Sequence, residues 1–306
     1  MTFTPARFKR PVLLIIGCGD VGLRIARLLR RAGGDKGWKL FALTSSPSRV
    51  EALRQAGVQP LIGNLDDPAT LGRLGPLADA VMHLAPPPAT GSHDPRTAHL
   101  LQALARGGRV RRIVYASTTG VYGNCDGAFI DETRAVNPCT ARARRRVDAE
   151  ARLRWWGRAC GARVSVLRIP GIYAPDREGG HPRDRLLQGK PVLVAEDDVH
   201  TNHIHADDLA RACIAALHRG APQRIVNASD DSDLKMGDYF DLAADLCGLA
   251  RPPRVTRSEA RMQLSEMSMT FLGESRRLNN RRLKRELGVR LRYPTVREGL
   301  MAPGHP

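Results

Sequence analysis

The segment 12–43 constrains the fold of this chain more than any other. Residues 12–16 form a continuous apolar run, which is typical of a strand buried on both faces. Residues 17–22 read Gly-Cys-Gly-Asp-Val-Gly, and apolar side chains then recur with helical spacing up to the glycine pair at 33–34. A second apolar run occupies residues 39–43. A GxGxxG turn between a buried strand and a helix, in a unit of about 30 residues, predicts a dinucleotide-binding βαβ fold.

Each glycine of the glycine-rich turn has its own structural role. Gly17 permits a tight turn, Gly19 lets the backbone approach a pyrophosphate, and Gly22 lets the helix pack closely on the strand. The N-terminus of the helix offers free N–H groups and a partial positive charge to the phosphates. We therefore expect Gly17, Gly19, Asp20, Val21 and Gly22 to contact the cofactor. The alternative is a glycine-rich turn that holds no ligand.

The end of the second strand bears on the choice of dinucleotide. NAD-binding folds usually place Asp or Glu there, where the carboxylate binds the ribose 2′-hydroxyl. Here Thr44, Ser45 and Arg49 follow the strand, and residues 43–49 contain no carboxylate. Hydroxyls and a guanidinium can receive a 2′-phosphate instead, so NADP(H) is favoured while NAD(H) stays open. The alternative for Arg49 is a surface position on the next helix.

Strand and helix patterns alternate well beyond this unit. They predict an α/β fold, a doubly wound parallel sheet of the Rossmann type. We expect residues 1–170 to form the dinucleotide-binding domain, and residues 171–306 to form mainly a smaller substrate-binding lobe over the carboxyl ends of the strands. A strand near 224–226 should return to the main sheet. The other expected strands are 58–62, 80–84, 113–116 and 164–168, and the expected helices are 96–105 and 140–159.

Composition argues against a disordered chain, a collagen and a disulfide scaffold. With 306 residues, 42% of them hydrophobic and 26% charged, the chain has the composition of an ordinary soluble globular protein. Its formal net charge of +17, from 48 basic and 31 acidic residues, raises the question of a nucleic-acid partner. However, only six of the basic residues are Lys, and the Arg residues are spread along the chain rather than gathered in blocks. We therefore interpret most of the charge as surface arginine and do not expect nucleic acid as the partner.

The sequence also bears on location. No apolar run approaches the ~18 residues that span a bilayer, so we expect no membrane association. Residues 1–10 are polar and basic and show no cleavage signature of a signal peptide. The six cysteines form no CxxC pair and do not have the spacing of a zinc site. These features predict a cytoplasmic protein with reduced thiols.

Several motifs, in order along nearly the whole chain, resemble the extended short-chain dehydrogenases/reductases of the NAD-dependent epimerase/dehydratase type. Residues 63–67 (GNLDD) are similar to the family's GDLxD, 83–86 (HLAP) to its HLA loop, and 117–123 (STTGVYG) to SSxxVYG. Residues 167–173 (LRIPGIY) are similar to LRxxxIYGP, and 202–210 (NHIHADDLA) to xxIHVDDLA. The glycine-rich turn departs slightly, because the extended form usually reads GxxGxxG.

This resemblance implies further site residues. Asn64 and Leu65 would lie beside the adenine, with Asn64 in the place of the usual Asp. The cofactor would also be contacted by Leu84, Ala85 and Pro86 beside the ribose and by Pro170 in the LRxxxIYGP segment. Thr118 matches the hydroxyl that hydrogen-bonds a substrate carbonyl.

The proton-transfer pair of the family is missing. Its YxxxK motif stands on the long helix, and anchoring on Pro138 and Glu150 puts Arg142 in the Tyr position and Arg146 in the Lys position. A guanidinium is effectively always protonated, so the usual mechanism cannot run through these two residues. Arg146 could still bind the nicotinamide ribose, and Arg142 could bind an anionic group of the substrate. We take Thr118, Arg142 and Arg146 as the residues at the catalytic positions of an atypical member.

Other residues with suitable chemistry have simpler interpretations. Tyr122 and Tyr173 could transfer a proton, but the resembling motifs give them mainly structural roles. The carboxylates of 131–132 match a family segment, with capping or a surface role as the alternative. On an extended strand His203 and His205 would share one face and His200 would point the other way. The resemblance explains this segment as a strand that links the lobes, so we expect no metal site. The tryptophans at 155–156 are expected to pack on the sheet.

Two functions follow from the sequence. The first is an NAD(P)-dependent oxidoreductase or epimerase-like enzyme that acts on a small carbonyl or sugar-type substrate, anionic if Arg142 binds it. The second is a non-catalytic NAD(P)-binding sensor or scaffold that kept the fold and lost the Tyr/Lys pair. The expected partner is a small-molecule substrate. A homodimer through the long helix, as in many relatives, is left open.

Overall fold

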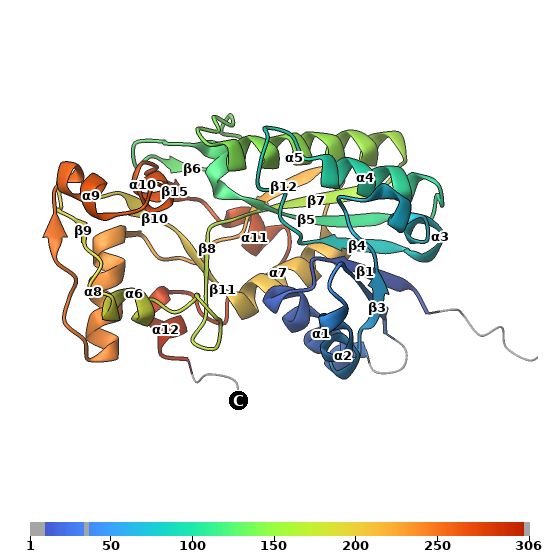
Figure 1. The fold of residues 1–306 in the computed structure, drawn as a ribbon, viewed down its shortest axis with the longest axis horizontal. Coiled ribbons are helices and arrows are strands. Elements are labelled where there is room, and N and C mark those ends of the chain that lie inside the picture. Colours follow the sequence, from blue (N-terminus) through green and yellow to red (C-terminus); the bar gives the residue numbers. More distant parts are fainter. Residues whose placement is uncertain (1–9, 34–36, 303–306) are drawn as a thin grey trace, which may run out of the picture.

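A single parallel sheet organises the part of the chain that the computed structural model describes, residues 10–33 and 37–302. Its seven parallel strands lie in the order β12-β7-β5-β4-β1-β2-β3 (Figure 1). The strand order reverses between β1 and β4: β2 and β3 are added on one side of β1, and β4 and the later strands on the other. The strands are β1 (Val12–Ile16), β2 (Lys39–Thr44), β3 (Gln59–Ile62), β4 (Ala80–His83), β5 (Arg112–Thr118), β7 (Arg163–Ile169) and β12 (Arg224–Asn227). This is the doubly wound Rossmann order, so the predicted fold class is confirmed.

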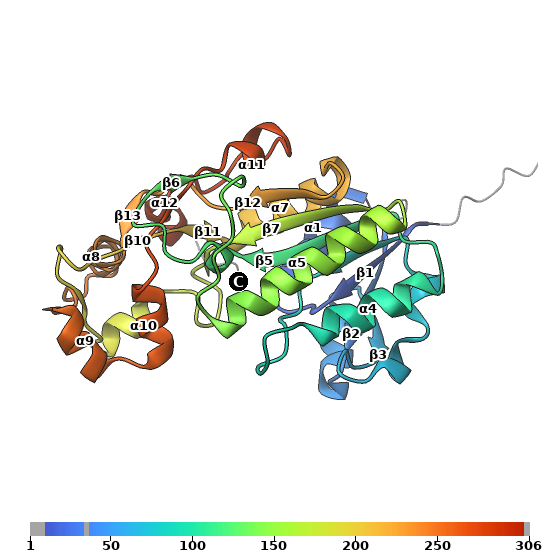
Figure 2. The same ribbon diagram turned by 90° about the horizontal axis from the view of Figure 1, so that it is seen from above.

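Helices cover both faces of the sheet (Figures 1 and 2). One face carries α1 (Asp20–Gly33), α2 (Val50–Gln55), α7 (Ala206–Arg219) and α11 (Arg281–Arg285), and the other carries α3 (Leu74–Leu77), α4 (Pro95–Ala105) and α5 (Ala141–Ala159). In β1, Leu13 and Ile15 pack on the α1 side, whereas Leu14 and Ile16 pack on the α5 side. Burial of both faces explains why this strand is an unbroken apolar run.

A smaller lobe lies at one end of the sheet, on the left in Figure 1. Its helices are α6 (Arg183–Leu187), α8 (Met236–Cys247), α9 (Arg257–Gln263), α10 (Glu266–Leu272) and α12 (Val296–Leu300). Its strands form two-stranded pairs: β8 (Gly171–Tyr173) with β11 (His203–His205), β9 (Val192–Leu193) with β14 (Arg254–Val255), β10 (His200–Thr201) with β13 (Leu234–Lys235), and β6 (Phe129–Ile130) with β15 (Arg277–Leu278). Tyr173, Val192 and Phe240 are buried in its core.

Part of the chain beyond residue 170 returns to the sheet. The strand expected near 224–226 is β12, which pairs in parallel with β7. Helix α7 packs against α1, and α11 packs against β12. Residues 171–302 therefore contribute one strand and two helices to the Rossmann layers as well as the lobe.

A buried carboxylate joins the long helix α5 to two strands of the sheet. Glu150 on α5 accepts hydrogen bonds from Ser117 Oγ (2.5 Å) and from Arg168 Nε (3.2 Å) and Nη2 (2.8 Å). Arg168 also lies over the ring of Tyr122, 4.6 Å from its centroid. The Arg168 and Glu150 side chains are 4% and 6% exposed. Because a charge taken out of water needs a partner, this pair fixes how α5 lies on β5 and β7.

A second buried charge ties α1 to elements far along the chain. Arg24 on α1 is 2% exposed and bonds Asp20, Asp176 and Asp207 at 3.0, 2.7 and 2.5 Å. Asp176 follows β8, and Asp207 begins α7. Arg177 also bonds Asp20, at 2.8 Å. This network holds the segment after β8 against the N-terminal turn of α1.

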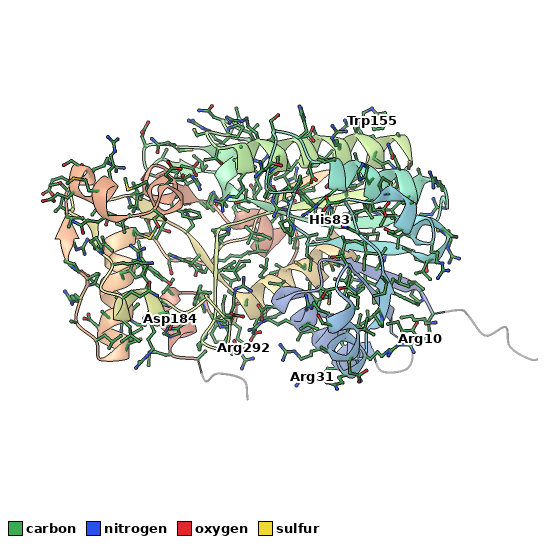
Figure 3. The ribbon with its side chains drawn as sticks, viewed as in Figure 1. Arg10, Arg31, His83, Trp155, Asp184 and Arg292 are labelled. Carbon is green, nitrogen blue, oxygen red and sulfur yellow. The ribbon has the colours of Figure 1, made fainter. Side chains whose placement is uncertain are left out.

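The two tryptophans of α5 differ. Trp156 is buried in the sheet core as expected, but Trp155 is 66% exposed on the outer side of the helix (Figure 3). Consecutive helical positions point about 100° apart, so one helix cannot turn both rings to the sheet. The expectation that both tryptophans pack on the sheet is therefore wrong for Trp155.

The described part of the chain bears on two expectations, the absence of membrane-spanning helices and the presence of reduced thiols. None of its helices is long and apolar enough to cross a membrane. All six cysteines lie within it, and each is a free thiol.

Replacing Glu150 by Ala should lower the free energy of unfolding by about 3–5 kcal/mol, because Arg168 would keep a buried charge without a partner. Urea denaturation followed by circular dichroism measures the change. The matched control is Glu51→Ala, because the Glu51 side chain is 69% exposed beside Arg54. This substitution should change the free energy of unfolding by about 0.5 kcal/mol or less. A loss below about 1 kcal/mol for Glu150→Ala would contradict the role given to this pair.

Candidate functional site

The glycine-rich turn has the geometry that a dinucleotide needs. Gly17 has φ +82°, and a Cβ there would lie 2.5 Å from the backbone nitrogen of Ala85, so this position requires glycine. A Cβ at Gly22 would lie 3.1 Å from Cys18 Sγ, where the helix packs against the turn. A Cβ at Gly19 would meet nothing within 4 Å, so the backbone there faces open space at the start of α1. That space is where the motif predicts a pyrophosphate.

A cavity of about 320 Å³ adjoins this turn at the carboxyl ends of β1, β2 and β3. It brings together seven of the predicted cofactor residues: Gly17, Thr44, Ser45, Arg49, Asn64, Leu65 and Ala85. Arg49 reaches across it and donates from Nη2 to the carbonyl of Cys18 at 2.8 Å. Hydroxyls and a guanidinium therefore lie where the second strand ends, as the sequence predicts.

An ion pair that the sequence did not predict closes one side of the same cavity. Arg96 on α4 donates from Nε and Nη2 to the two carboxylate oxygens of Asp66, at 2.8 and 2.6 Å. This bond holds the pKa of Asp66 below its usual range. Asn64 accepts a bond from the backbone N–H of Asp66 at 3.0 Å, so its side chain shapes the turn that carries Asp66. Arg96 and Asp66 both line the cavity.

The remaining predicted cofactor residues line neither this cavity nor the second one described below: Gly19, Asp20, Val21, Gly22, Leu84 and Pro86. Asp20 uses its side chain in the Arg24 network. Its backbone and that of Val21 belong to the first turn of α1, whose N–H groups are the groups that bind phosphate in this fold. Taken together, the open position at Gly19 and the hydroxyl-lined cavity fit a nicotinamide dinucleotide.

The second cavity, of about 550 Å³, lies between the sheet and the lobe. It brings together the predicted residues Thr118, Arg142, Arg146 and Pro170. Thr118 ends β5, and its Oγ1 accepts a bond from the backbone N–H of Gly120 at 3.3 Å. The hydroxyl is only partly buried, so it can also meet a ligand in the cavity.

Arg146, which the resemblance puts in the place of the family Lys, is held against β5. Its Nη1 donates to the carbonyl of Ala116 at 2.7 Å and to the hydroxyl of Tyr115 at 3.1 Å. Its Nε and Nη2 make no hydrogen bond to any residue that the structure describes. Burial raises the pKa of Tyr115 to about 12, so this phenol stays protonated near neutral pH.

Arg142, which the resemblance puts in the place of the family Tyr, keeps its guanidinium available. Within residues 10–33 and 37–302, no hydrogen bond or ion pair joins it to another side chain. It lies over the ring of Phe271, 4.9 Å from the centroid. Burial lowers the pKa of Arg142, and the nearby carboxylate of Glu274 opposes that shift. A guanidinium remains a cation near neutral pH, so Arg142 can bind an anion here but cannot transfer a proton.

The other candidates for proton transfer lie elsewhere. Tyr122 donates to Asn227 Oδ1 at 2.7 Å, and Tyr173 donates to the carbonyl of Thr295 at 3.2 Å. Neither phenol lines the second cavity. The carboxylate of Glu132 accepts from the backbone N–H of Asn227, and that of Asp131 accepts from Thr133. These contacts are structural, in line with the interpretation that the sequence favours.

The histidines of the lobe are part of its packing. His203 stacks on Tyr239 at 4.1 Å, and burial lowers its pKa to about 3. His205 caps α7 by accepting from the backbone N–H of Asp207. Tyr173 meets both rings edge-on, as expected for side chains on one face of a strand. No cluster of three or more potential metal ligands is found among the residues with described positions.

Phe271, Glu274 and Arg276 line the second cavity, and the sequence analysis did not predict them there. Glu274 and Arg276 form an ion pair at 2.8 Å, and both side chains are 11% exposed. No local motif marks this segment, and only the folded lobe brings it to the end of β5. A search for carboxylates in the lobe would have found Glu274 as one of many.

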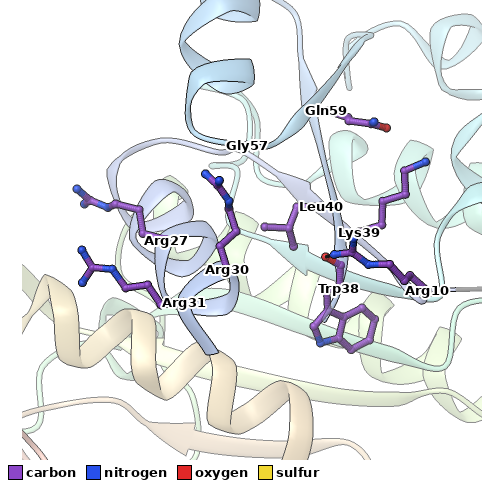
Figure 4. A pocket seen from close by; sticks show the side chains of 9 residues that line it. All are labelled: Arg10, Arg27, Arg30, Arg31, Trp38, Lys39, Leu40, Gly57 and Gln59. Atoms are coloured by element: carbon purple, nitrogen blue, oxygen red, sulfur yellow. Dashed lines mark hydrogen bonds between the residues drawn. The ribbon is translucent and has the colours of Figure 1, made fainter. Parts of the chain in front are cut away.

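A further hollow lies at the opposite edge of the sheet. It measures about 610 Å³ and is lined by Arg10, Arg27, Arg30, Arg31, Trp38, Lys39, Leu40, Gly57 and Gln59 (Figure 4). Lys39 and Gln59 begin β2 and β3, so this hollow is at the amino ends of the strands, away from the glycine-rich turn. Arg27 and Arg31 point away from the side that Trp38 occupies (Figure 4). Its basic side chains do not converge on one point, and it is not the dinucleotide site.

Known proteins resemble this chain over nearly its whole length. Residues 13–229 match the model of the NAD dependent epimerase/dehydratase family. Protein YeeZ of Escherichia coli is 27% identical over 288 residues, which cover 92% of this chain and 95% of YeeZ. The structure of a functionally unknown conserved protein from Silicibacter pomeroyi has 32% identity and a TM-score of 0.79, covering 95% of this chain and 96% of that one.

A characterised enzyme shares the fold at lower identity. UDP-glucose 4-epimerase from Thermotoga maritima, solved with UDP-glucose, is 20% identical with a TM-score of 0.76, covering 94% of this chain and 96% of that one. The match of the family model covers the sheet, the glycine-rich turn and the end of β5. The chain therefore belongs to the NAD dependent epimerase/dehydratase family, within the extended short-chain dehydrogenase/reductase superfamily.

Proposed function

We propose that this protein is an NAD(P)-dependent oxidoreductase or epimerase-like enzyme with an atypical site. Its substrate is a small anionic molecule of carbonyl or sugar type. The observation that carries the proposal is the unpaired guanidinium of Arg142, which lies in the second cavity with the hydroxyl of Thr118. Six free thiols support work in a reducing compartment, the cytoplasm.

The residues of the second cavity have separate tasks in this proposal. The nicotinamide cofactor, when bound, supplies hydride chemistry. Thr118 donates a hydrogen bond to the substrate oxygen, and Arg142 holds an anionic group of the substrate. Arg146 contributes fixed positive charge beside the end of β5, and its Nε and Nη2, which bond no described residue, are available to a ligand. Pro170 lines the wall between them.

NADP(H) is the proposed dinucleotide. The cavity at the end of β2 contains Thr44, Ser45 and Arg49, and Asp66, its lining carboxylate, is already paired with Arg96. A 2′-phosphate there would meet a cation and hydroxyl donors rather than a free carboxylate. A 2′-hydroxyl would find no free carboxylate to bind.

A non-catalytic dinucleotide-binding sensor or scaffold is the second candidate. It is favoured by one observation: no Tyr or Lys is among the residues that line the second cavity. Substitution separates the two candidates. Hydride exchange on any substrate that Thr118→Ala abolishes, while NADPH still binds, would exclude the scaffold.

NADPH should raise the melting temperature more than NADH at equal concentration, because only NADPH carries the 2′-phosphate that Arg49 can bind. The variant Arg49→Ala should lose most of this difference, since a hydrogen bond to a charged group contributes about 1.5–3 kcal/mol. Differential scanning fluorimetry with both dinucleotides measures the shifts.

The matched control for Arg49 is Arg54→Ala, an exposed arginine on α2 that does not line the cavity. It should leave both shifts unchanged. An NADH shift equal to or larger than the NADPH shift would contradict the NADP(H) proposal. The absence of any shift would contradict dinucleotide binding itself.

With NADP⁺ present, the protein should bind UDP-glucuronate more tightly than UDP-glucose. The two ligands differ by a carboxylate, and a charged hydrogen bond of about 1.5–3 kcal/mol corresponds to roughly tenfold or more in affinity. Arg142→Met should abolish the preference and leave UDP-glucose binding within about twofold, because it removes the cation but keeps most of the side-chain volume. Isothermal titration calorimetry measures both affinities.

Arg144→Met is the control for this experiment, since Arg144 is exposed on the same helix and does not line the cavity. It should keep the preference. An equal affinity of the wild-type protein for both ligands, or a preference that survives Arg142→Met, would contradict the anion-binding role.

A further inference from the structure

The proposed function leaves one chemical task without a residue. Oxidising a hydroxyl removes a hydride from carbon and a proton from oxygen, and the proton needs an acceptor within reach. The guanidiniums of Arg142 and Arg146 carry no lone pair that can take it. The Thr118 hydroxyl alone is too weak an acid or base. Since no Tyr lines the second cavity, the acceptor must come from elsewhere in its wall.

Glu274 supplies the carboxylate that lines this cavity. It stands in the loop between α10 and β15, and that loop is bonded to the segment after Thr118. The carbonyl of Ser275 accepts from the backbone N–H groups of Cys125 (2.9 Å) and Gly127 (3.1 Å). Arg276 Nη1 donates to the carbonyl of Gly123 at 2.8 Å. These bonds hold Glu274 against the end of β5 instead of leaving it on a free loop.

The carboxylate of Glu274 and the hydroxyl of Thr118 face one small space. A Cβ placed on Gly120 would lie 3.7 Å from Thr118 Oγ1 and 3.9 Å from Glu274 Oε2. Both groups therefore lie within 4 Å of one point beside Gly120, on the wall of the same cavity. Glu274 Oε2 bonds Arg276, whereas Oε1 makes no hydrogen bond to a described residue. Oε2, the oxygen that lies near Gly120, is therefore anchored by Arg276, and Oε1 of the same carboxylate is available to take a proton.

We infer that Glu274 is the proton-transfer residue of this site and takes the place of the missing tyrosine. The inference rests on the proposed function. In the oxidative direction, the substrate O–H breaks and its proton goes to the Glu274 carboxylate. The C–H electron pair leaves as hydride to the oxidised nicotinamide dinucleotide, so a C=O forms. In reverse, the Glu274 carboxyl group returns the proton to the oxygen. Thr118 positions that oxygen, and Arg276 holds the carboxylate.

His200 is the competing residue in the same wall. Its Nδ1 lies 3.3 Å from Asp233 Oδ1, and its Cδ2 would lie 3.2 Å from a Cβ on Gly127. The ring is therefore packed between Asp233 and the Gly127 turn. His203 has no comparable access, because it is buried and stacked on Tyr239. Glu274 is favoured because it shares the space at Gly120 with Thr118.

The test compares the full-length wild-type protein with Glu274→Gln, His200→Asn and the control Glu266→Gln, an exposed carboxylate on α10 outside the cavity. Each is loaded with NADP⁺ and mixed with UDP-glucose, UDP-glucuronate or dTDP-glucose, and cofactor reduction is followed by absorbance. We expect Glu274→Gln to lose about 100-fold or more of the rate, as removal of a general base does, and the other two to stay within about threefold. NADPH affinity, read by fluorescence titration, should be equal in all four.

Infrared difference spectra, recorded once each variant has reduced the same fraction of its cofactor, report the protonation of the carboxylate itself. Hydride transfer should produce the band of a protonated carboxyl group in the wild type, and Glu274→Gln should lack it. A second variant, Gly120→Ala, keeps the carboxylate but fills the shared space. Its methyl group would make only ordinary contacts of 3.7–3.9 Å, so it should fold, bind NADPH normally and lose turnover.

The outcomes separate the two proposals. Turnover within about threefold of wild type in Glu274→Gln or Gly120→Ala would overturn the role of Glu274 and leave the proposed function standing. Loss in His200→Asn alone would overturn it in favour of His200. NADPH binding without cofactor reduction by any of the three probes in the wild type would overturn the proposed function, and this inference with it. If Glu274→Gln fails to fold, Gly120→Ala decides.

Discussion

The rotation of α5 on the sheet is the constraint on which the candidate site depends, and the buried carboxylate of Glu150 sets it. Arg142, Arg146 and Glu150 are spaced four residues apart, so they lie along one face of the helix. Glu150 is bonded to Ser117 and Arg168 on two strands, which leaves the helix no freedom to turn. Arg146 must then meet the end of β5, and Arg142 must face the cavity between the sheet and the lobe.

The two arginines differ in their chemistry from the Tyr/Lys pair that the resemblance predicts at these positions. A Tyr/Lys pair can release and take up a proton, whereas two guanidiniums supply only fixed positive charge and donors. Arg146 donates hydrogen bonds from Nη1 to Ala116 and Tyr115, and the guanidinium of Arg142 remains available to a ligand. The proposed division of labour places anion binding on α5 and proton transfer on the C-terminal lobe, at Glu274.

The sequence predicts best what depends on neighbouring residues. β1, the glycine-rich turn and α1 follow from local pattern, and the positions of Arg142 and Arg146 follow from helical spacing. The pairing of Arg49 with the Cys18 carbonyl, and of Arg96 with Asp66, could not be read from the sequence because each joins separate elements. Glu274 was missed for the same reason, since bonds from Ser275 and Arg276 to the 123–127 turn hold its loop near the end of β5. Trp155 shows the limit of a local argument, because adjacent helical residues face different ways.

The net charge of +17 also has a more specific meaning in the folded chain. Many arginines pair with carboxylates, as Arg24, Arg96 and Arg168 do, while Arg142 stays unpaired inside a cavity. The most direct test of the whole account is a crystal structure of the protein with NADP⁺ and UDP-glucuronate. The account predicts the sugar carboxylate on Arg142 and the reacting hydroxyl between Thr118 and Glu274, within hydrogen-bond distance of both. A sugar carboxylate away from Arg142, or a reacting hydroxyl that contacts neither Thr118 nor Glu274, would contradict it.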